Sequence, residues 1–145
     1  MANPVMKKAM RVANSVAVGL YRRSSGRIGG KIQGTRVLLL TVAGRKTGTP
    51  HTVAVSYFDH DGGYLLAGSA GGAKYDPQWV RNLAAAKKAT IQIGGMSHDV
   101  DARLAEGAER DTLWRDVVVA TAPFFGKYQE KSGRTIPVAI LTPRA

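Results

Sequence analysis

Short apolar segments with strand character follow one another along this chain. A continuous apolar, β-branched run spans residues 36–43, and a second such run spans 51–58 after a glycine-containing turn. Shorter runs follow at 64–68, 89–93, 99–104 and 136–141. Six strands with few and short intervening helices predict a mainly β (α+β) fold, a β-barrel with peripheral helices, rather than a doubly wound parallel sheet.

The first segment is predicted to be an amphipathic helix over residues 4–23. Apolar side chains recur there at three- and four-residue spacing, while Lys8, Arg11 and Arg22 lie on other faces. The apolar stripe consists of Val5, Ala9, Ala13, Val16 and Leu20. We expect this stripe to pack on the domain itself, and a membrane surface or a partner protein is the alternative.

Three further helices are predicted between the strands. The first spans 77–86, with a proline in its first turn and Asp76 as its N-cap, and the others span 109–121 and 124–131. The glycine-rich, basic segment 24–34 ends the first helix and reads mostly as a linker, with a weak alternative as a phosphate cradle. The chain is therefore divided into an N-terminal helix (1–23), a connector (24–34) and a cofactor-binding barrel domain (35–145).

Positive charge is concentrated in the first part of the chain. The net charge is +11 over 145 residues, a length suited to one domain. Ten of the 21 lysines and arginines precede residue 59, and no Asp or Glu lies there. An anionic partner is therefore expected at the N-terminal half, and nucleic acid, a phospholipid surface and a phosphorylated cofactor all qualify.

Cysteine is absent, so the chain has no disulfide, thiolate metal site or cysteine nucleophile. The N-terminal residues alternate cations with short apolar pieces and do not form a secretion signal. The longest uncharged run, 12–21, is about half of the roughly 20 residues that a membrane-spanning helix needs. We therefore predict a cytoplasmic protein without a membrane span, with contact of the first helix with the inner face of the cell membrane as an addition left open.

The turn at 41–51, TVAGRKTGTPH, is the strongest candidate for ligand binding. Gly44 and Gly48 permit positive φ, and cationic and hydroxyl donors surround them. Such a turn suits a phosphate or a carboxylate, and the donors are Arg45, Lys46, Thr47 and His51. It is not a P-loop, because a strand rather than a helix is expected to follow. A merely solvated hairpin tip is the alternative.

A second candidate segment spans 69–82, SAGGAKYDPQWVRN. Small residues at 69–73 let a flat ligand approach the backbone closely, and Lys74 adds a cation. Trp79 and Asn82 lie on one face of the predicted helix. A glycine loop that only caps a helix is the alternative for this stretch.

Conventional catalytic sets are missing from the sequence. His51, His60 and His98 fit no metal-ligand spacing, so no metal site is predicted. Asp59 and Asp61 read as turn formers rather than as an acid/base pair. Hydride transfer fits this pattern, because a redox cofactor carries the chemistry while the protein supplies orientation and electrostatics.

Three motifs in order resemble the deazaflavin (F420)-dependent nitroreductase, or F420H2-dependent reductase, family of actinobacteria. They are LLLTVAGRKTGTPHTV, SAGGAKYDPQWVRNL and YQEKSGRTIPVAILTP, and the likeness runs from about Tyr21 to Pro143. The resemblance implies a split β-barrel of the flavin-nucleotide-binding type. It also implies coenzyme F420, a phosphodiester with a polyglutamate tail, as hydride donor, and quinones or other electron-poor conjugated molecules as acceptors.

The resemblance further implies roles for individual residues. The cofactor's phosphate and acidic tail are expected at Arg45, Lys46, Thr47 and His51, the last standing where many members have arginine. The deazaflavin ring is expected beside Val53, Ala54, Val55 and Ala67, with amides of Ser69, Gly71, Gly72, Ala73 and Lys74 and a wall of Trp79 and Asn82. The acceptor is expected against Phe124, Phe125 and Tyr128, with Tyr128 as the catalytic residue that orients or protonates it.

One departure from the family concerns this acceptor wall. The nitroimidazole-activating member has a tyrosine-rich wall, whereas this chain reads Ala122, Pro123, Phe124, Phe125 and retains only Tyr128. The sequence therefore favours an apolar acceptor, such as a menaquinone-like ring, over nitro compounds.

The predicted function is an F420-dependent oxidoreductase that reduces a quinone, enone or similar acceptor. Flavin mononucleotide is the alternative cofactor. A non-catalytic coenzyme- or lipid-binding protein is the alternative function. Nucleic-acid binding is not expected, because the basic half lacks interleaved aromatic residues for stacking. A homodimer is compatible with the sequence.

Overall fold

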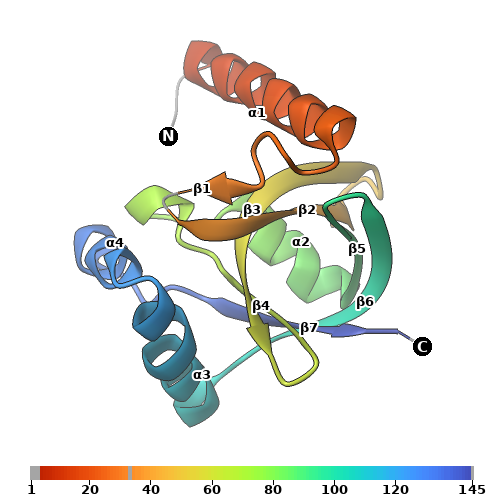
Figure 1. Cartoon of the computed structure of the whole chain (residues 1–145). Helices are drawn as coiled ribbons and strands as arrows, with labels where there is room; N and C mark the ends of the chain where they lie inside the picture. Colours follow the sequence, from red (N-terminus) through yellow and green to blue (C-terminus); the bar gives the residue numbers. More distant parts are fainter. Residues whose placement is uncertain (1–3, 33, 145) are drawn as a thin grey trace.

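The computed structural model describes residues 4–32 and 34–144, and the strands within them form a β-barrel with helices on its outside (Figure 1). Six strands close the barrel in the order β2-β3-β4-β7-β6-β5, with β5 pairing back onto β2, and all neighbours are antiparallel. This architecture confirms the predicted fold class. The strands are β1 (Lys31–Ile32), β2 (Thr35–Ala43), β3 (Pro50–His60), β4 (Gly63–Ala67), β5 (Lys88–Ile93), β6 (Met96–Leu104) and β7 (Val138–Pro143).

The ends of the six predicted strands differ from the observed ends by at most three residues. The last strand begins at Val138 rather than at Ile136. The reason is that side chains of the neighbouring helices form hydrogen bonds with the backbone of Ile136. The Ile136 carbonyl accepts hydrogen bonds from Arg110, and its N–H donates to Gln129. These groups are therefore not available to the β4–β7 ladder.

Strand β2 is apolar along its length because both of its faces are covered. Leu38 and Leu40 point into the barrel and belong to its inner cluster. Val37 and Leu39 point to the outside, where they pack against Val18 and Tyr21 of α1 (Pro4–Ser24). A strand buried on both faces reads as a continuous apolar run rather than an alternating one.

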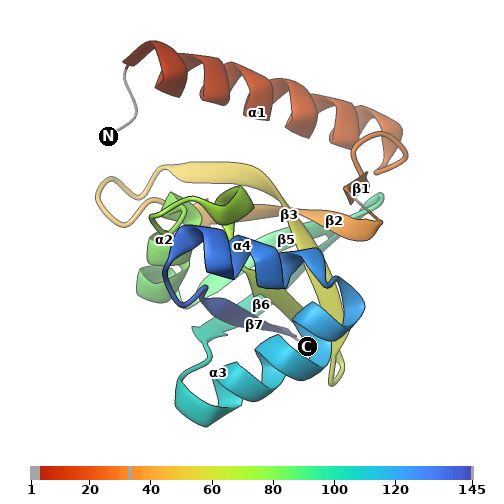
Figure 2. The ribbon, with the colours of Figure 1, turned by 90° about the vertical axis from the view of Figure 1, so that its left-hand side faces the viewer.

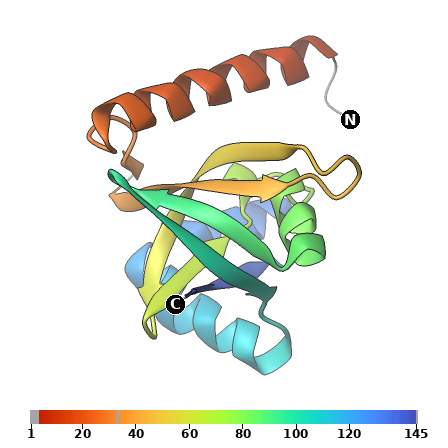
Figure 3. The same ribbon diagram turned by 90° about the vertical axis from the view of Figure 1, so that its right-hand side faces the viewer.

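Helices cover the remaining surfaces of the barrel. Helix α2 (Gln78–Ala86) contacts β2, β5 and β6 (Figure 3). It contributes Trp79, Val80 and Leu83 to the inner cluster. On another side, α3 (Gly107–Leu113), a π-helical segment (Trp114–Val119) and α4 (Phe124–Ser132) enclose a second apolar cluster against β4 and β7. The predicted helix 109–121 is thus two joined segments of different winding.

The predicted N-cap of the helix at 77–86 is wrong. Helix α2 begins at Gln78 after Pro77, and no side chain caps its N-terminus. Asp76 instead accepts a hydrogen bond from Arg134 at 2.6 Å. The ion pair with a distant arginine replaces the local cap that the sequence pattern indicated.

Helix α1 lies across the barrel beside β3 (Figure 2). Its predicted apolar stripe faces away from the domain. Val5 is 78% exposed, Val16 55% and Leu20 43%. The expectation that this stripe packs on the domain is therefore wrong. The buried contacts of α1 come from Val18 and Tyr21 instead. No helix in the described part of the chain combines the length and hydropathy needed to cross a bilayer.

The described residues of the segment 24–34 make backbone hydrogen bonds to the helix before them and to β2. The segment contains β1, which pairs with the start of β2, and Gly26 donates a hydrogen bond to the Tyr21 carbonyl at 2.8 Å. Gly26 has φ +83°, and a Cβ there would approach Gly94 to 3.0 Å. The glycine is needed for this close approach. The division of the chain at residues 23 and 34 stays a prediction.

Candidate functional site

A cleft of about 870 Å³ lies between α1 and the barrel. One side is formed by α1, the facing side by the β2–β3 loop and the start of β3, and α2 contributes the rest. Many residues that the sequence proposed for the cofactor meet in this cleft although they come from separate segments. They are Arg45, Lys46, Thr47, His51, Val53, Trp79 and Asn82.

The β2–β3 loop is closed by its own hydrogen bonds. Gly44 donates to the Thr49 carbonyl and accepts from the Gly48 N–H, both at 2.8 Å, and the Thr49 N–H donates to Thr47 Oγ1 at 3.2 Å. Gly48 has φ +75°, as expected for a glycine at this position. Gly44 allows His51 to lie close to the loop backbone, because a Cβ there would lie 3.1 Å from His51 Nε2. The compact turn leaves Arg45 and Lys46 exposed at the cleft.

Asn82 connects this loop to α2. Its Oδ1 accepts hydrogen bonds from the Arg45 backbone N–H at 3.1 Å and from Arg45 Nη1 at 2.8 Å. Asn82 is buried. It therefore positions both the loop backbone and the arginine, besides lining the cleft as the sequence proposed.

The cleft has a strongly cationic lining. Arg11 and Arg22 lie on the α1 side, and Arg45 and Lys46 lie on the loop side. None of the described residues that line the cleft is an Asp or Glu. Within residues 4–32 and 34–144, no three His, Asp or Glu side chains gather as metal ligands. An anionic ligand fits this set of donors better than a metal ion.

A second hollow of about 280 Å³ adjoins the cleft, and Trp79 lines both of them. Its lining is mostly apolar and comes from β3, the end of β4, the following turn and α4. The proposed ring neighbours Ala54, Val55, Ala67 and Ser69 lie here, together with Phe124, Phe125 and Tyr128. The structure thus brings the proposed phosphate, ring and acceptor residues into two adjoining hollows.

The aromatic residues of α4 pack against one another. The Phe124 and Phe125 rings stack with centroids 4.8 Å apart, and each meets Tyr128 edge to face at 5.6 Å. Phe125 is only 4% exposed and also contacts Phe58 and Trp114. Phe125 therefore forms the back of the wall, while Phe124 and Tyr128 are half-buried.

Three of the remaining proposed cofactor residues, Gly72, Ala73 and Lys74, are not among the residues that line either hollow. Gly71 and Gly72 lie in a short 3-10 turn (Ala70–Gly72) after β4, and Ala73 and Lys74 are exposed beyond it. A Cβ on Gly72 would meet the Lys131 side chain at 3.0 Å, so this glycine allows the turn to approach α4. Its observed role is packing of the turn.

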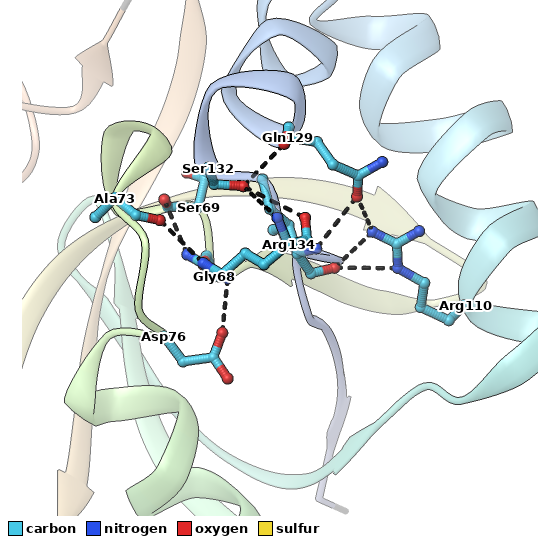
Figure 4. Close-up of polar contacts among 9 residues, drawn as sticks. Gly68, Ser69, Ala73, Asp76, Arg110, Gln129, Ser132 and Arg134 are labelled. Atoms are coloured by element: carbon cyan, nitrogen blue, oxygen red, sulfur yellow. Dashed lines mark hydrogen bonds and ion pairs between the residues drawn. The ribbon is translucent and has the colours of Figure 1, made fainter.

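Two arginines that the sequence reasoning missed hold this region together (Figure 4). Arg134 donates to the carbonyls of Gly68, Ser69 and Ala73 at 2.9–3.2 Å and pairs with Asp76. Arg110 donates to the Ile136 carbonyl and to Gln129. The third motif, YQEKSGRTIP, contains Gln129 and Arg134, so their place in that motif was the available signal.

The residues of α1 that line the cleft were also missed. Arg11, Asn14, Val18 and Arg22 all face it. Their spacing of three or four residues was visible in the sequence. The more apolar stripe on the other side of the helix was taken as the packed face instead.

Comparisons with known proteins agree on one family. Residues 13–143 match the family of F420H(2)-dependent quinone reductases. An F420H(2)-dependent quinone reductase of Mycobacterium tuberculosis (strain H37Rv) is 35% identical over 128 residues, which are 86% of each chain. The solved structure of an F420-H2 dependent reductase, FDR-A, is 33% identical with a TM-score of 0.64, over 72% of this chain and 92% of that one.

Another solved structure, described as a domain-swapped dimer, is 27% identical with a TM-score of 0.65 and covers 94% of this chain and 96% of its own. The matches confirm the resemblance seen in the sequence, with F420 rather than flavin mononucleotide as the cofactor. The chain belongs to the F420H(2)-dependent quinone reductase family and is an F420-dependent reductase.

Proposed function

We propose that the protein reduces a quinone, or a similar electron-poor conjugated acceptor, and that the two adjoining hollows hold coenzyme and acceptor. The observation that carries this proposal is the junction at Trp79, where a cationic cleft meets an aromatic hollow. An anionic tail and a flat ring of one coenzyme need such a pair of neighbouring environments. Support also comes from the family to which the chain belongs.

The residues present fit coenzyme F420. Its phosphodiester and glutamate tail are anionic, and the cleft offers Arg45, Lys46 and the Thr47 hydroxyl without a competing carboxylate in its described lining. The small side chains of Ala54 and Ala67 leave room in the second hollow for a flat ring system. Trp79 lies between these two environments.

When bound, the reduced coenzyme supplies a hydride to the acceptor. The protein's residues bind and orient the two reactants. Lys46 and Arg45 neutralise negative charge, and Asn82 keeps Arg45 in place. Phe124 and Phe125 exclude water from the hollow, and Tyr128 orients the acceptor carbonyl and donates a proton to its oxygen. The Tyr128 ring is held by edge contacts with both phenylalanines.

The lining of the second hollow supports an apolar acceptor. Its polar side chains are Ser56, Ser69 and Tyr128, and the rest are aliphatic, aromatic or proline. A quinone or an enone with an apolar ring fits such a lining better than a polar nitro compound. Nitroreduction is therefore expected to be weak.

The test has two steps on the same protein. Coenzyme F420 is titrated into it, and oxidation of the reduced coenzyme is then followed with a quinone, an enone and a nitroaromatic compound of similar size. We expect saturable binding, and turnover that is fastest with the quinone. Tight binding without turnover by any acceptor would favour the non-catalytic alternative, and faster turnover of the nitroaromatic would contradict the proposed acceptor class.

We also propose that α1 contacts an anionic membrane surface. The support is its outward apolar face, which includes Val16 and Leu20, with the exposed cations Lys8 and Arg23 on the same helix. Co-sedimentation with phosphatidylglycerol vesicles should exceed that with phosphatidylcholine vesicles. The double variant Val16→Ser, Leu20→Ser should lose most of this binding. Dimerisation that the same variant abolishes, without vesicle binding, would assign the face to a second copy.

A further inference from the structure

One face of α1 forms a wall of the coenzyme cleft. Arg11, Asn14, Val18 and Arg22 recur at three- and four-residue spacing, which places them on one side of a helix. Ser15 and Gly19 flank this side and also line the cleft. The wall combines two guanidinium groups with small and amide side chains, so a ligand can approach the helix closely.

Burial of the aliphatic stripe does not set the rotation of α1, which packs Val18 and Tyr21 on the barrel instead. Its aliphatic stripe faces outward, with Val16 and Leu20 exposed, while both arginines face the barrel side. The hydrophobic effect alone would favour burial of this stripe. Specific contacts must therefore select the observed rotation.

These contacts come from the side of α1 that faces the barrel. The Tyr21 hydroxyl donates to the Val37 carbonyl and accepts from the Gly94 N–H, both at 2.9 Å. Asn14 Nδ2 donates to the Thr52 carbonyl at 2.9 Å, and Arg22 Nη2 approaches Thr52 Oγ1 at 3.4 Å. The helix is thereby held over the strand β3 that leads away from the basic loop.

Cations on facing sides of one cleft repel each other. Arg11 and Arg22 share the cleft with Arg45 and Lys46, and the described lining holds no carboxylate to compensate them. Opposed cations across a solvent-filled gap gain stability when an anion lies between them. The glutamate tail and phosphodiester of F420 carry several negative charges on a flexible chain, which can reach both sides at once.

We propose that α1 is the second wall of the coenzyme site and that Arg11 and Arg22 bind the anionic tail of F420. This inference rests on the proposed function and extends it to residues of the N-terminal helix. The basic loop and α1 then hold the tail from two sides. The affinity for the coenzyme then depends on α1, whereas binding of the ring and the acceptor in the second hollow does not depend on this helix.

The test compares ligands with and without the tail. Affinities of Arg11→Gln and Arg22→Gln are measured for F420 and for the deazaflavin riboside that lacks the phosphodiester and glutamates. Each variant should bind F420 roughly 10- to 100-fold more weakly than the wild type, as expected for a lost charged hydrogen bond. Each variant should bind the riboside with the same affinity as the wild type. Lys8→Gln and Arg23→Gln are matched controls on α1, because neither side chain lines the cleft.

A second measurement separates a binding role from a structural one. Amide hydrogen exchange of α1 should slow when F420 is added to the wild-type protein, and the riboside should leave it unchanged. Arg11 is exposed, so Arg11→Gln should not alter the melting temperature. If the wild-type protein binds F420 tightly and both variants bind it equally well, the inferred role of α1 is wrong, while the proposed function stands. Absence of F420 binding by the wild type would overturn the proposed function and this inference with it.

Discussion

Two residues of α2 position the walls of the two hollows. Asn82 anchors the basic loop through two hydrogen bonds from Arg45, and Trp79, one turn earlier on α2, lines both hollows. Both side chains are held by a helix that packs Val80 and Leu83 into the barrel. The loop can therefore carry exposed cations and still keep a defined position.

Lys46→Ala should weaken F420 binding far more than it slows turnover at saturating coenzyme. Lys46 is expected to pair with an anionic group remote from the reacting ring, and a lost charged hydrogen bond is worth roughly 1.5 to 3 kcal/mol. Lys74→Ala is the matched control, since Lys74 is exposed and lines neither hollow. Dissociation constants by fluorescence titration check both. A larger effect at Lys74 would place the tail over the 69–74 segment instead.

Phe125→Tyr should lower the free energy of unfolding by about 1 to 3 kcal/mol. Phe125 is 4% exposed and packs on Phe58 and Trp114, so an added hydroxyl must overpack the second cluster or remain without a partner. Chemical denaturation of the variant measures the change. If the variant is as stable as the wild type and reduces polar acceptors faster, the edge of the ring at position 125 reaches the second hollow.

At the scale of elements, the segment 68–77 between β4 and α2 is held by an arginine from the segment 133–137 between α4 and β7. Arg134 donates to three carbonyls and one carboxylate of the segment 68–77 (Figure 4). Its side chain is 15% exposed. Ser69 and Pro77, near the two ends of the segment between β4 and α2, both line the second hollow. The shape of that hollow therefore depends on an arginine outside it.

Arg134→Gln should destabilise the protein by about 2 kcal/mol or more and speed amide exchange in residues 68–76. Glutamine cannot reach all four acceptors, which leaves partly buried carbonyls without donors. Arg103→Gln is the control, because its pair with Glu109 is exposed and such pairs contribute about 0 to 1 kcal/mol. Equal losses in the two variants would mean that Arg134 is no more than a surface ion pair.

At the scale of the whole molecule, α1 covers one outer face of a barrel that closes without it. The six closing strands pair among themselves, and none of the described side chains of α1 belongs to the two larger apolar clusters. Only the small cluster of Val18, Tyr21, Val37 and Leu39 joins the helix to β2. The helix is thus a separable part of the site rather than of the barrel core.

Removal of residues 1–23 should leave a folded barrel that is less stable by on the order of 3 kcal/mol, because the outer face of β2 becomes exposed. F420 affinity should fall together with stability, since one cleft wall is lost. Circular dichroism and thermal melts establish the fold, and a titration establishes the affinity. A truncated protein that does not fold would make the helix part of the core.

Several features of this protein were set by its sequence alone. The strand runs, the glycine turn with its cations and the three motifs predicted the barrel, the family and many of the residues that line the two hollows, but none of those on α1. These signals are local, because strand propensity, turn chemistry and residue spacing act over a few neighbouring residues. Such signals can be read from the sequence because they do not depend on distant parts of the chain.

Tertiary structure alone decided which way α1 faces and what Arg134 and Asp76 do. Periodicity shows which residues share a helix face, but it does not show whether that face meets protein or solvent. Hydrogen bonds from Tyr21 and Asn14 to β2 and β3 settled the rotation against the apolar stripe. Asp76 sits where a cap belongs, yet an arginine 58 positions later offers it a charged partner. Pairings between residues so far apart in sequence exist only once the barrel has closed.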